Sequence, residues 1–339
     1  MKKINFAIVG ATGAVGRKVL EILNEQKDFL PIEDIKLLAS DKSAGTKLYF
    51  NSKELTVERA DSESFNDVDI AIFCAGSDVS IKLAPEAVKK GTIVIDNSSA
   101  FRMQKEVPLI IPEVNPDEIK KHKGIIANPN CSTIQMVVAL KPIYDLAGIK
   151  RIIASTFQSV SGTGIEAVEE LKNQSAQIIS GQEVECKVYP YQIAFNVLPH
   201  IDEFDEMGNT KEELKLINET KKILNDWDIN ITATAVRVPV IIGHSESVYI
   251  ETVEKTTVAE VREALSKAPG VIIYDKPSQK QYPLPIDVAG KNEVFVGRIR
   301  EDISVENGLN LWIVADNLRK GAAYNALQIS KYIVENNLV

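Results

Sequence analysis

The sequence has few cysteines. Three cysteines stand among 339 residues, at Cys74, Cys131 and Cys186. An odd and sparse set of this kind is a poor disulfide framework and is typical of a protein in a reducing compartment. We therefore expect a cytoplasmic location. We also expect that any cysteine with a function acts as a free thiol.

The sequence also lacks a basic block and a long apolar run. Lys and Arg number 39 and Asp and Glu 47, which gives a net charge of −8. This balance argues against nucleic acid or an anionic membrane as a partner, so any anionic ligand must be held by local cations. No stretch approaches the roughly 18 uncharged apolar residues of a membrane span. The short apolar run within residues 1–10 leads into a glycine-rich turn and does not resemble a targeting segment.

The length predicts two domains, because single cores rarely grow beyond about 250–300 residues. The first, residues 1–130, alternates apolar strands with helical patterns, which indicates βαβ units and a Rossmann-type parallel sheet. We expect its strands at residues 4–9, 35–39, 68–75, 92–96 and 125–127, with helices at 17–26 and 79–89.

The second domain, residues 131–315, has a different pattern of apolar and polar residues. A helix over 131–147 precedes segments in which apolar and polar residues alternate, which predicts an α+β domain with a mainly antiparallel sheet. The expected strands are 151–158, 230–240, 247–253, 294–300 and 311–315, and the expected helices are 164–179, 211–225 and 258–265. A last helix, within 316–339, is expected to return to the first domain.

A glycine-rich turn lies between the first strand and the first helix. Its sequence, Gly10-Ala-Thr-Gly-Ala-Val-Gly16, lets backbone N–H groups approach a pyrophosphate at a helix N-terminus. The G-x-x-G-x-x-G spacing departs from the usual G-x-G-x-x-G, so a tight turn without a ligand is the alternative.

The residues after the second strand bear on which dinucleotide is bound. An acid here usually binds the ribose 2′-hydroxyl of NAD, whereas a cation serves the 2′-phosphate of NADP. Asp41 is an acid, yet Ser40, Lys42 and Ser43 form a cluster suited to phosphate, and we expect NADP. A solvated surface turn is the alternative.

Cys131 is the candidate nucleophile. It follows Asn130, a good helix cap, and so should lie in a first helical turn, where a thiol pKa falls and the thiolate is favoured. Cys74 ends a buried strand and is expected to be structural, while Cys186 lies in a charged stretch.

Three histidines are candidates for proton transfer. His122 lies among lysines and is expected at the surface, and His200 could be structural. His244 stands where an apolar segment gives way to a polar turn, which is where catalytic groups cluster, although a structural histidine is an equal alternative.

These residues together resemble the aspartate-semialdehyde dehydrogenase family along the whole chain. The segments that carry the resemblance are residues 10–16, 97–102, 128–133, 157–164, 212–215, 237–246, 295–300 and 316–323. The family's reaction is the NADPH-dependent reductive dephosphorylation of L-4-aspartyl phosphate to L-aspartate 4-semialdehyde. It proceeds through a cysteine thioester and supplies lysine (by way of diaminopimelate), methionine and threonine synthesis.

The resemblance implies a role for each matching residue. Cys131 matches the nucleophile, His244 the acid/base and Gln158 the residue that orients the acyl group. The remaining matches are Arg237 for the substrate carboxylate, Glu212 for its amino group, Arg102 and Lys215 for phosphate, and Gly10, Thr12, Gly13, Ala14, Val15, Ser40, Lys42, Ser43, Ser161, Gly162 and Asn317 for the cofactor. Lys42 stands where the family commonly has arginine. Because lysine is a point charge and not a bidentate donor, this departure is expected to weaken binding of a 2′-phosphate.

Several of these residues could instead have purely structural roles. Arg237 could form a surface ion pair, Glu212 and Lys215 could be an i, i+3 pair, Arg102 could be an ordinary loop arginine and Gln158 could bind backbone groups. Rival functions are a related acyl-phosphate reductase such as N-acetyl-glutamyl-phosphate reductase, a malonyl-CoA reductase, a cysteine protease and a dinucleotide sensor without catalysis. We expect a homodimer formed through the second domain, and no metal site.

Overall fold

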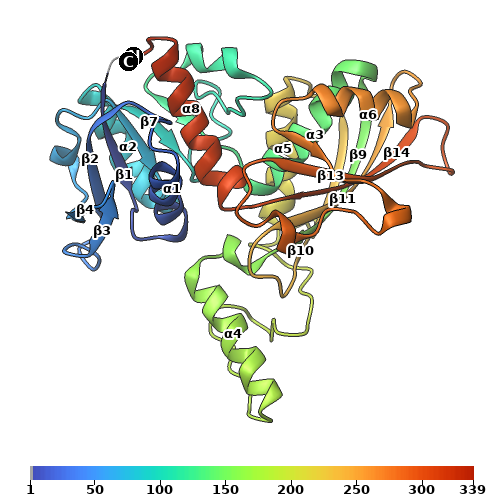
Figure 1. Cartoon of the computed structure of the whole chain (residues 1–339), viewed down its shortest axis with the longest axis horizontal. Helices are drawn as coiled ribbons and strands as arrows, with labels where there is room; N and C mark the ends of the chain where they lie inside the picture. Colours follow the sequence, from blue (N-terminus) through green and yellow to red (C-terminus); the bar gives the residue numbers. More distant parts are fainter. Residues whose placement is uncertain (1–2) are drawn as a thin grey trace. The chain divides into compact units, whose positions relative to one another are not determined.

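The computed structural model describes residues 3–339 and divides the chain into two compact units (Figure 1). The first unit comprises the chain up to Asn130 together with Ala322–Val339. The second comprises Cys131–Gly321. No helix within residues 3–339 is long and apolar enough to cross a membrane.

The first unit is built on a six-stranded parallel sheet with the strand order β5-β2-β1-β6-β7-β8. Its central strands are continuous apolar runs, because both faces are covered. Its strands are β1 (Ile4–Val9), β2 (Ile32–Ala39), β5 (Glu58–Arg59), β6 (Ile70–Phe73), β7 (Ile93–Asp96) and β8 (Ile125–Ala127), and its helices are α1 (Ala14–Glu25), α2 (Ser77–Lys89) and α8 (Tyr324–Glu335).

A single apolar core joins the sheet to its helices. Phe6 and Ile8 of β1 pack in one cluster with Val19 of α1 and with Leu327 and Ile333 of α8. The return of the last helix to this unit therefore follows from its apolar face. Two short 3-10 helices, η1 (Ser62–Phe65) and η2 (Pro116–Lys121), complete the connections.

The sequence patterns did not predict a hairpin made of β3 (Lys47–Phe50) and β4 (Lys53–Thr56). Its two-residue turn, Asn51-Ser52, has φ values of 48° and 65°. Two positive φ angles are typical of a type I′ turn, whose twist matches that of the strands it joins. The asparagine was the signal that could have revealed it.

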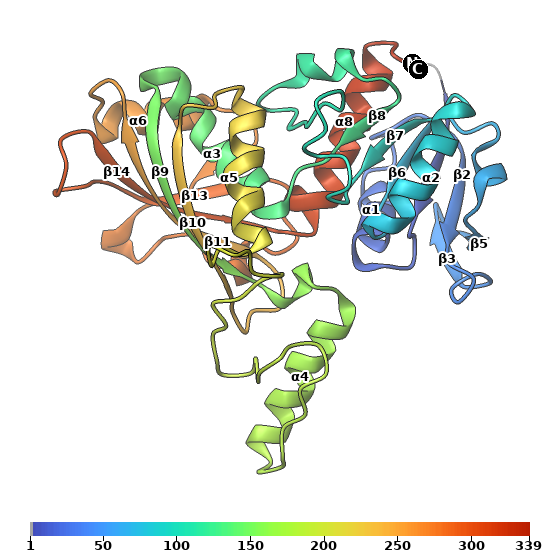
Figure 2. The ribbon, with the colours of Figure 1, turned by 180° about the vertical axis from the view of Figure 1, so that it is seen from behind.

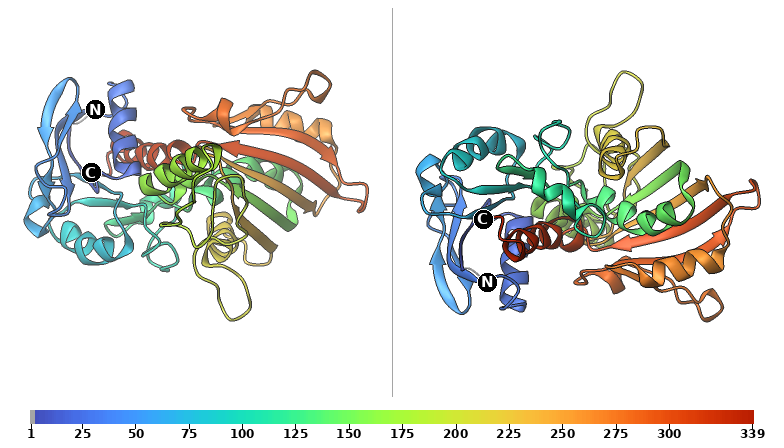
Figure 3. Two further views of the ribbon diagram at one scale, coloured as in Figure 1. Left: turned by 90° about the horizontal axis from the view of Figure 1, so that it is seen from below. Right: turned by 90° about the horizontal axis from the view of Figure 1, so that it is seen from above.

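The second unit contains a mixed six-stranded sheet with the order β10-β9-β11-β14-β13-β12. Helices α3, α5 and α6 cover one of its faces, while α4 and the loop after it extend away from the sheet (Figures 1, 2 and 3). The strands are β9 (Ile149–Gln158), β10 (Asn230–Arg237), β11 (His244–Thr252), β12 (Val271–Ile273), β13 (Val294–Glu301) and β14 (Gly308–Ala315). The helices are α3 (Cys131–Ala147), η3 (Val160–Gly162), α4 (Ile165–Ile179), α5 (Lys211–Leu224), α6 (Val258–Lys267), η4 (Pro277–Gln279) and α7 (Pro285–Val288); a π-helical turn, η5 (Arg319–Ala323), begins in this unit.

The direction of β10 corrects the sequence interpretation. We expected an antiparallel strand over 230–240, but β10 ends at Arg237 and pairs with β9 in parallel. The reason is the connection, since α4 and α5 lie between the two strands and carry the chain back to the starting edge. β12 and β13 are also parallel, and the remaining neighbours are antiparallel.

The glycine-rich turn offers a test of this packing. A Cβ atom at Gly16 would lie 2.2 Å from the Gly10 carbonyl oxygen, whereas one at Gly13 would lie 3.4 Å from the same atom. We expect Gly16→Ala to lower the free energy of unfolding by roughly 1–3 kcal/mol through overpacking. Gly13→Ala, the matched control, should change it by less than about 0.5 kcal/mol. Urea unfolding monitored by circular dichroism measures both, and equal losses would contradict the packing described here.

Candidate active site

Cys131 is the first residue of α3. The helix that follows it is buried along most of its length, so its N-terminus is fixed rigidly beneath the sheet. The N–H groups of a first helical turn favour negative charge, which suits a thiolate. A Cβ atom at Gly321 would lie 2.9 Å from the Cys131 Cβ atom, so only glycine leaves room beside this side chain.

The ends of three neighbouring strands meet in this unit. β9 and β10 run in parallel, and their last residues, Gln158 and Arg237, are paired in register. β11 runs antiparallel to β9 and begins at His244. The parallel pairing that the sequence interpretation missed is therefore what places Arg237 beside Gln158 at the edge where β11 starts.

His244 is fully buried, and its ring is oriented by Ser159. The Ser159 backbone N–H donates to His244 Nδ1 at 3.0 Å, so the neutral ring carries its proton on Nε2. The Ser159 hydroxyl lies 3.1 Å from the same Nδ1 and can accept its proton when the ring is doubly protonated. Burial, and then the nearby Arg237 charge, lower the His244 pKa to about 3, which keeps the imidazole neutral.

Arg237 is also buried and shares Ser159 with His244. Its Nη1 donates to the Ser159 carbonyl oxygen at 2.8 Å. Its Nε and the Nε2 of His244 are buried without a hydrogen-bond partner within residues 3–339. Buried polar groups are normally paired, so these two donors point to a ligand that supplies acceptors.

Gly162 leaves space above this pair. A Cβ atom there would lie 3.2 Å from Arg237 Nη1 and 3.3 Å from His244 Nε2. Both distances are tighter than ordinary carbon contacts, so a side chain at this position would crowd the two groups. The absence of a side chain therefore leaves Arg237 Nη1 and His244 Nε2 uncrowded on this side.

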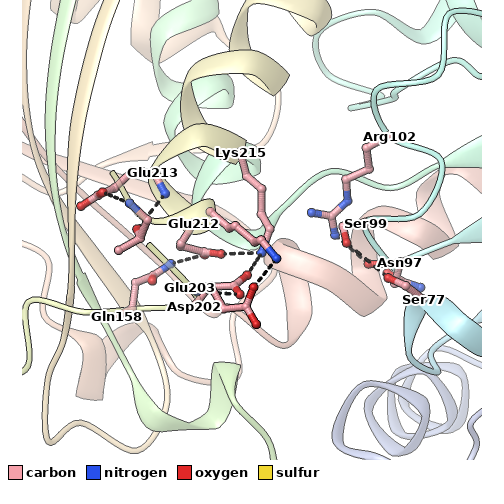
Figure 4. Close-up of polar contacts among 12 residues, drawn as sticks. Ser77, Asn97, Ser99, Arg102, Gln158, Asp202, Glu203, Glu212, Glu213 and Lys215 are labelled. Atoms are coloured by element: carbon pink, nitrogen blue, oxygen red, sulfur yellow. Dashed lines mark hydrogen bonds and ion pairs between the residues drawn. The ribbon is translucent and has the colours of Figure 1, made fainter. Parts of the chain in front are cut away.

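Gln158, Glu212 and Lys215 form a polar network with Asp202 (Figure 4). Gln158 Nε2 donates to Glu212 Oε1 at 3.0 Å and also to the Ser132 hydroxyl. Lys215 Nζ lies 3.1 Å from Glu212 Oε2 and 2.8 Å from Asp202 Oδ2. Burial acts to lower the Lys215 pKa, but the two carboxylates outweigh it and the pKa is raised. Lys215 is therefore a fixed positive charge.

The position of Glu212 follows from a well-defined helix start. Thr210 caps α5, and its side chain and that of Glu213 form a reciprocal capping box. Glu212 lies in the first turn, is 6% exposed and bridges Gln158 to Lys215. The simple i, i+3 ion pair considered from the sequence exists, but it is part of this larger network.

Asn317 holds the loop before His244. Its Oδ1 accepts from the Gly243 backbone N–H at 2.9 Å and from the Ser159 hydroxyl at 3.0 Å, and its Nδ2 donates to Ser161 Oγ at 3.0 Å. The expected cofactor residues Ser161 and Asn317 are thus brought together near the His244 loop. A cofactor contact for either residue stays a prediction.

Apart from Gly162, which lies in the second unit, the remaining expected cofactor residues lie in the first unit. A cavity of about 770 Å³ is lined by the glycine-rich turn and by the end of β2, including Gly10, Thr12, Gly13 and Ser40. Gly10 has a φ of +83°, and a Cβ atom on it would lie 2.9 Å from the Cys74 backbone, so the turn admits no side chain there. This cradle at the start of α1 fits a pyrophosphate. Ala14 and Val15 form the first turn of α1, and Lys42 and Ser43 lie in the loop after β2.

Arg102 and Cys74 also belong to the first unit. Arg102 is buried and donates to the Asn128 carbonyl oxygen at 2.9 Å and the Asn97 carbonyl oxygen at 2.7 Å (Figure 4 shows it near Asn97). It is therefore no ordinary loop arginine. Burial raises the pKa of Cys74, which makes this thiol unreactive, as expected of a structural cysteine.

Sequence reasoning missed the residues that organise this site. Ser159 binds both His244 and Arg237, Ser132 binds Gln158, and Gly321 adjoins Cys131. All three lie in or beside segments that had been singled out, but a serine or glycine has no charge or titration that marks its role. The adjacency of Ser132 to Cys131 was the one usable signal.

Comparisons with known proteins identify the family. The model of the semialdehyde dehydrogenase NAD binding domain matches residues 5–122, and that of the semialdehyde dehydrogenase dimerisation domain matches residues 140–320. The aspartate-semialdehyde dehydrogenase of Aquifex aeolicus is 54% identical to the chain, over 98% of both sequences. That of Bacillus subtilis is 53% identical, over 99% of both. The chain belongs to the aspartate-semialdehyde dehydrogenase family.

A solved structure of the same family supports the fold. Aspartate semialdehyde dehydrogenase II from Vibrio cholerae, complexed with ASA, matches with a TM-score of 0.96 and 46% identity, over 99% of both chains. Membership of the aspartate-semialdehyde dehydrogenase family makes the chain an oxidoreductase of amino-acid biosynthesis with the family's reaction. The Rossmann-type domain and the α/β architecture expected from the sequence are confirmed.

Glu246 is a buried carboxyl group to which the sequence patterns assigned no role. It lies on β11 opposite Thr156, and its side-chain oxygens make no regular hydrogen bond within residues 3–339. Burial raises its pKa well above the usual value, while the Gln135 side chain acts in the opposite sense. The folded chain therefore holds its proton more tightly than the unfolded chain does.

This predicts a pH-dependent effect of Glu246→Gln. Because the folded-state pKa is raised, the wild-type protein loses stability as pH rises above about 4.5, the unfolded pKa, by about 1.4 kcal/mol per pH unit until the folded pKa is reached. The glutamine cannot ionise, so the variant should gain stability relative to wild type at pH 8 and little at pH 4.5. Urea midpoints at both values measure this. A gain that is equal at the two pH values would contradict the assignment.

Proposed function

We propose that the site in the second unit carries out the family's reaction, with Cys131 as nucleophile, His244 as acid/base and Arg237 as the ligand of the substrate carboxylate. The observation that carries this assignment is a pair of buried donors, Arg237 Nε and His244 Nε2, that have no hydrogen-bond partner among the residues that the structure describes. An arginine fork suits a carboxylate, and an imidazole N–H suits an oxyanion.

The first step forms the thioester. The Cys131 thiolate attacks the acyl carbon of L-4-aspartyl phosphate, the carbon–sulfur bond forms, the bond to the phosphate oxygen breaks and inorganic phosphate leaves. Arg102 and Lys215 are proposed to hold the phosphate. Lys215 would exchange its contact with Asp202 for the phosphate, which its flexible stem permits.

The second step reduces the thioester. NADPH, when bound, supplies the hydride for this reduction. His244 donates a hydrogen bond from Nε2 to the carbonyl oxygen as it becomes an alkoxide, and the Ser159 hydroxyl accepts from Nδ1 whenever the ring is doubly protonated. Collapse of the thiohemiacetal breaks the carbon–sulfur bond, releases the aldehyde and restores the thiolate.

Specificity for an amino acid is assigned to the network beside the nucleophile. Glu212 is proposed to bind the substrate ammonium group, and Gln158 to orient the acyl group. Gln158 Oε1 is buried without a partner within the described residues, so it can accept from a bound substrate. A substrate with an acylated amine would lose its charge attraction to Glu212, which disfavours N-acetyl-glutamyl phosphate.

The roles of Arg237 and His244 can be separated kinetically. Arg237→Lys keeps the charge but loses the fork and should raise KM by about one to two decades, since a charge-assisted hydrogen bond contributes roughly 1.5–3 kcal/mol. His244→Ala should lower kcat by about 10²–10⁴-fold. Steady-state kinetics measure both, with Arg151→Lys, an exposed arginine on β9, as the control. A change in kcat alone for Arg237→Lys, or in KM alone for His244→Ala, would refute the assignment.

For the cofactor, we propose NADP in preference to NAD, held by Gly10, Thr12, Gly13, Ala14, Val15, Ser40, Lys42 and Ser43. The support is the cradle in the glycine-rich turn, whose cavity Ser40 also lines, and the presence of Lys42 and Ser43 in the loop that follows β2. Asp41, the acid that could bind a ribose hydroxyl, is already ion-paired to Arg59 at 3.1 Å.

We expect kcat/KM for NADP to exceed that for NAD by at least about tenfold, because one charge-assisted contact to the 2′-phosphate contributes that much. The oxidation of aspartate semialdehyde in the presence of phosphate provides the assay. Values that are equal, or higher for NAD, would overturn the preference.

We also propose a homodimer that forms through the sheet of the second unit. The face opposite α3, α5 and α6 carries half-buried aromatic residues, among them the Phe157 and Trp312 pair with ring centroids 5.7 Å apart. Sedimentation velocity at micromolar concentration should give twice the 37.4 kDa chain mass, and Trp312→Glu should shift the measured mass toward that of the monomer. A monomeric wild-type protein would refute the dimer.

We propose a cytoplasmic location as well, because a catalytic thiol must stay reduced.

A further inference from the structure

The loop after β2 contains an ion pair that the family resemblance did not assign. Asp41 Oδ1 lies 3.1 Å from Nε of Arg59, and both side chains are mainly exposed. An acid near the end of the second strand is the group that binds ribose hydroxyls in NAD-specific folds. Here that acid is engaged by an arginine from another strand.

The backbone fixes where Arg59 stands. β5 is a two-residue strand that pairs in parallel with β2, and its register places Arg59 opposite Ala39, the last residue of β2. The Ala60 N–H donates to the Ala39 carbonyl oxygen at 2.8 Å, and the Gly45 N–H donates to the Val57 carbonyl oxygen at 2.8 Å. Arg59 is thus held at the carboxyl end of the sheet, beside the loop that contains Asp41.

Arg59 also lines the cavity that the glycine-rich turn forms. The same cavity of about 770 Å³ is bounded by Gly10, Thr12, Gly13 and Ser40. In a parallel sheet of this kind the pyrophosphate lies at the turn after β1, and the adenosine ribose lies toward the end of β2. Arg59 therefore stands at the end of the cavity where a 2′-phosphate would lie.

We propose that Arg59 is a direct ligand of the 2′-phosphate of NADP and that Asp41 orients it. The ion pair engages Nε, which leaves the Nη1–Nη2 edge of the guanidinium to bind two phosphate oxygens. Lys42 provides only a point charge, whereas Arg59 provides a planar fork, so the arginine supplies the geometry that Lys42 lacks. This inference rests on the proposed use of NADP.

The first test compares the two cofactors. Arg59→Ala should lower kcat/KM for NADP by about ten- to a hundredfold and change that for NAD by less than about twofold. NAD turnover then shows that the variant is folded. Lys53→Ala is the matched control, because it removes one positive charge from an exposed position on the nearby strand β4. It should leave both values within about twofold.

A second test measures nucleotide binding in the absence of turnover. Isothermal titration of the full chain with adenosine 2′,5′-bisphosphate and with adenosine 5′-monophosphate isolates the 2′-phosphate. Arg59→Ala should weaken the bisphosphate by about ten- to a hundredfold and leave the monophosphate unchanged. Asp41→Ala/Arg59→Ala separates direct contact from charge cancellation, since it restores the local charge but not the fork. The double variant should bind the bisphosphate as weakly as Arg59→Ala, and recovery to wild-type affinity would overturn the proposal.

The two proposals fail in distinguishable ways. If the wild-type protein prefers NADP and Arg59→Ala keeps that preference, the Arg59 assignment is wrong and the cofactor proposal stands. If the wild-type protein binds the bisphosphate no better than the monophosphate, both are wrong. A loss that appears equally in Lys53→Ala would show a long-range charge effect and would also overturn the direct contact.

Discussion

Two of the hydrogen bonds made by the backbone of Ser159 organise the proposed catalytic groups of the second unit. The N–H of this residue fixes the His244 ring, and its carbonyl oxygen fixes the Arg237 guanidinium. The first bond depends on β11 starting beside the end of β9, and the second depends on the parallel pairing that places the end of β10 beside the end of β9. One residue without charge thus sets both the tautomer of His244 and the position of the Arg237 guanidinium.

The same arrangement leaves polar groups buried without partners, which costs stability. Arg237 Nε, His244 Nε2 and Gln158 Oε1 are all in this condition in the second unit. Each unpaired buried group costs about 1–3 kcal/mol, and a bound substrate with a carboxylate, an acyl oxygen and an ammonium group can relieve that cost. The low His244 pKa has a related origin, because burial and the Arg237 charge oppose a second proton on the ring.

The elements with strong local signals were predictable from the sequence. The start of α3 at Cys131 and the first strand at Ile4–Val9 match the expectation because a polar cap and an apolar run are local properties. The direction of β10 was wrong, since alternation of apolar and polar residues does not distinguish parallel from antiparallel pairing. The β3–β4 hairpin was missed because its turn sequence, Asn51-Ser52, was not recognised as a type I′ signal.

The contacts between distant segments were not predictable. The sequence revealed Cys131, His244 and Arg237 as candidates, because reactive and charged groups in motifs attract attention. The contacts of Ser159 depend on where two strands end, and the role proposed for Arg59 depends on a two-residue strand whose register only the folded sheet defines. Sequence patterns therefore singled out the candidate reacting groups, while tertiary pairing determined the residues that orient them.

The central claim is that the acyl group passes through Cys131, and trapping that intermediate tests it most directly. The protein is mixed with L-4-aspartyl phosphate in the absence of NADPH, quenched in acid, digested and analysed by mass spectrometry. The account predicts a stoichiometric burst of phosphate and an aspartyl thioester on the peptide that contains Cys131, both lost in Cys131→Ala. Phosphate release without an adduct, or an adduct on Cys74 or Cys186 alone, would contradict it.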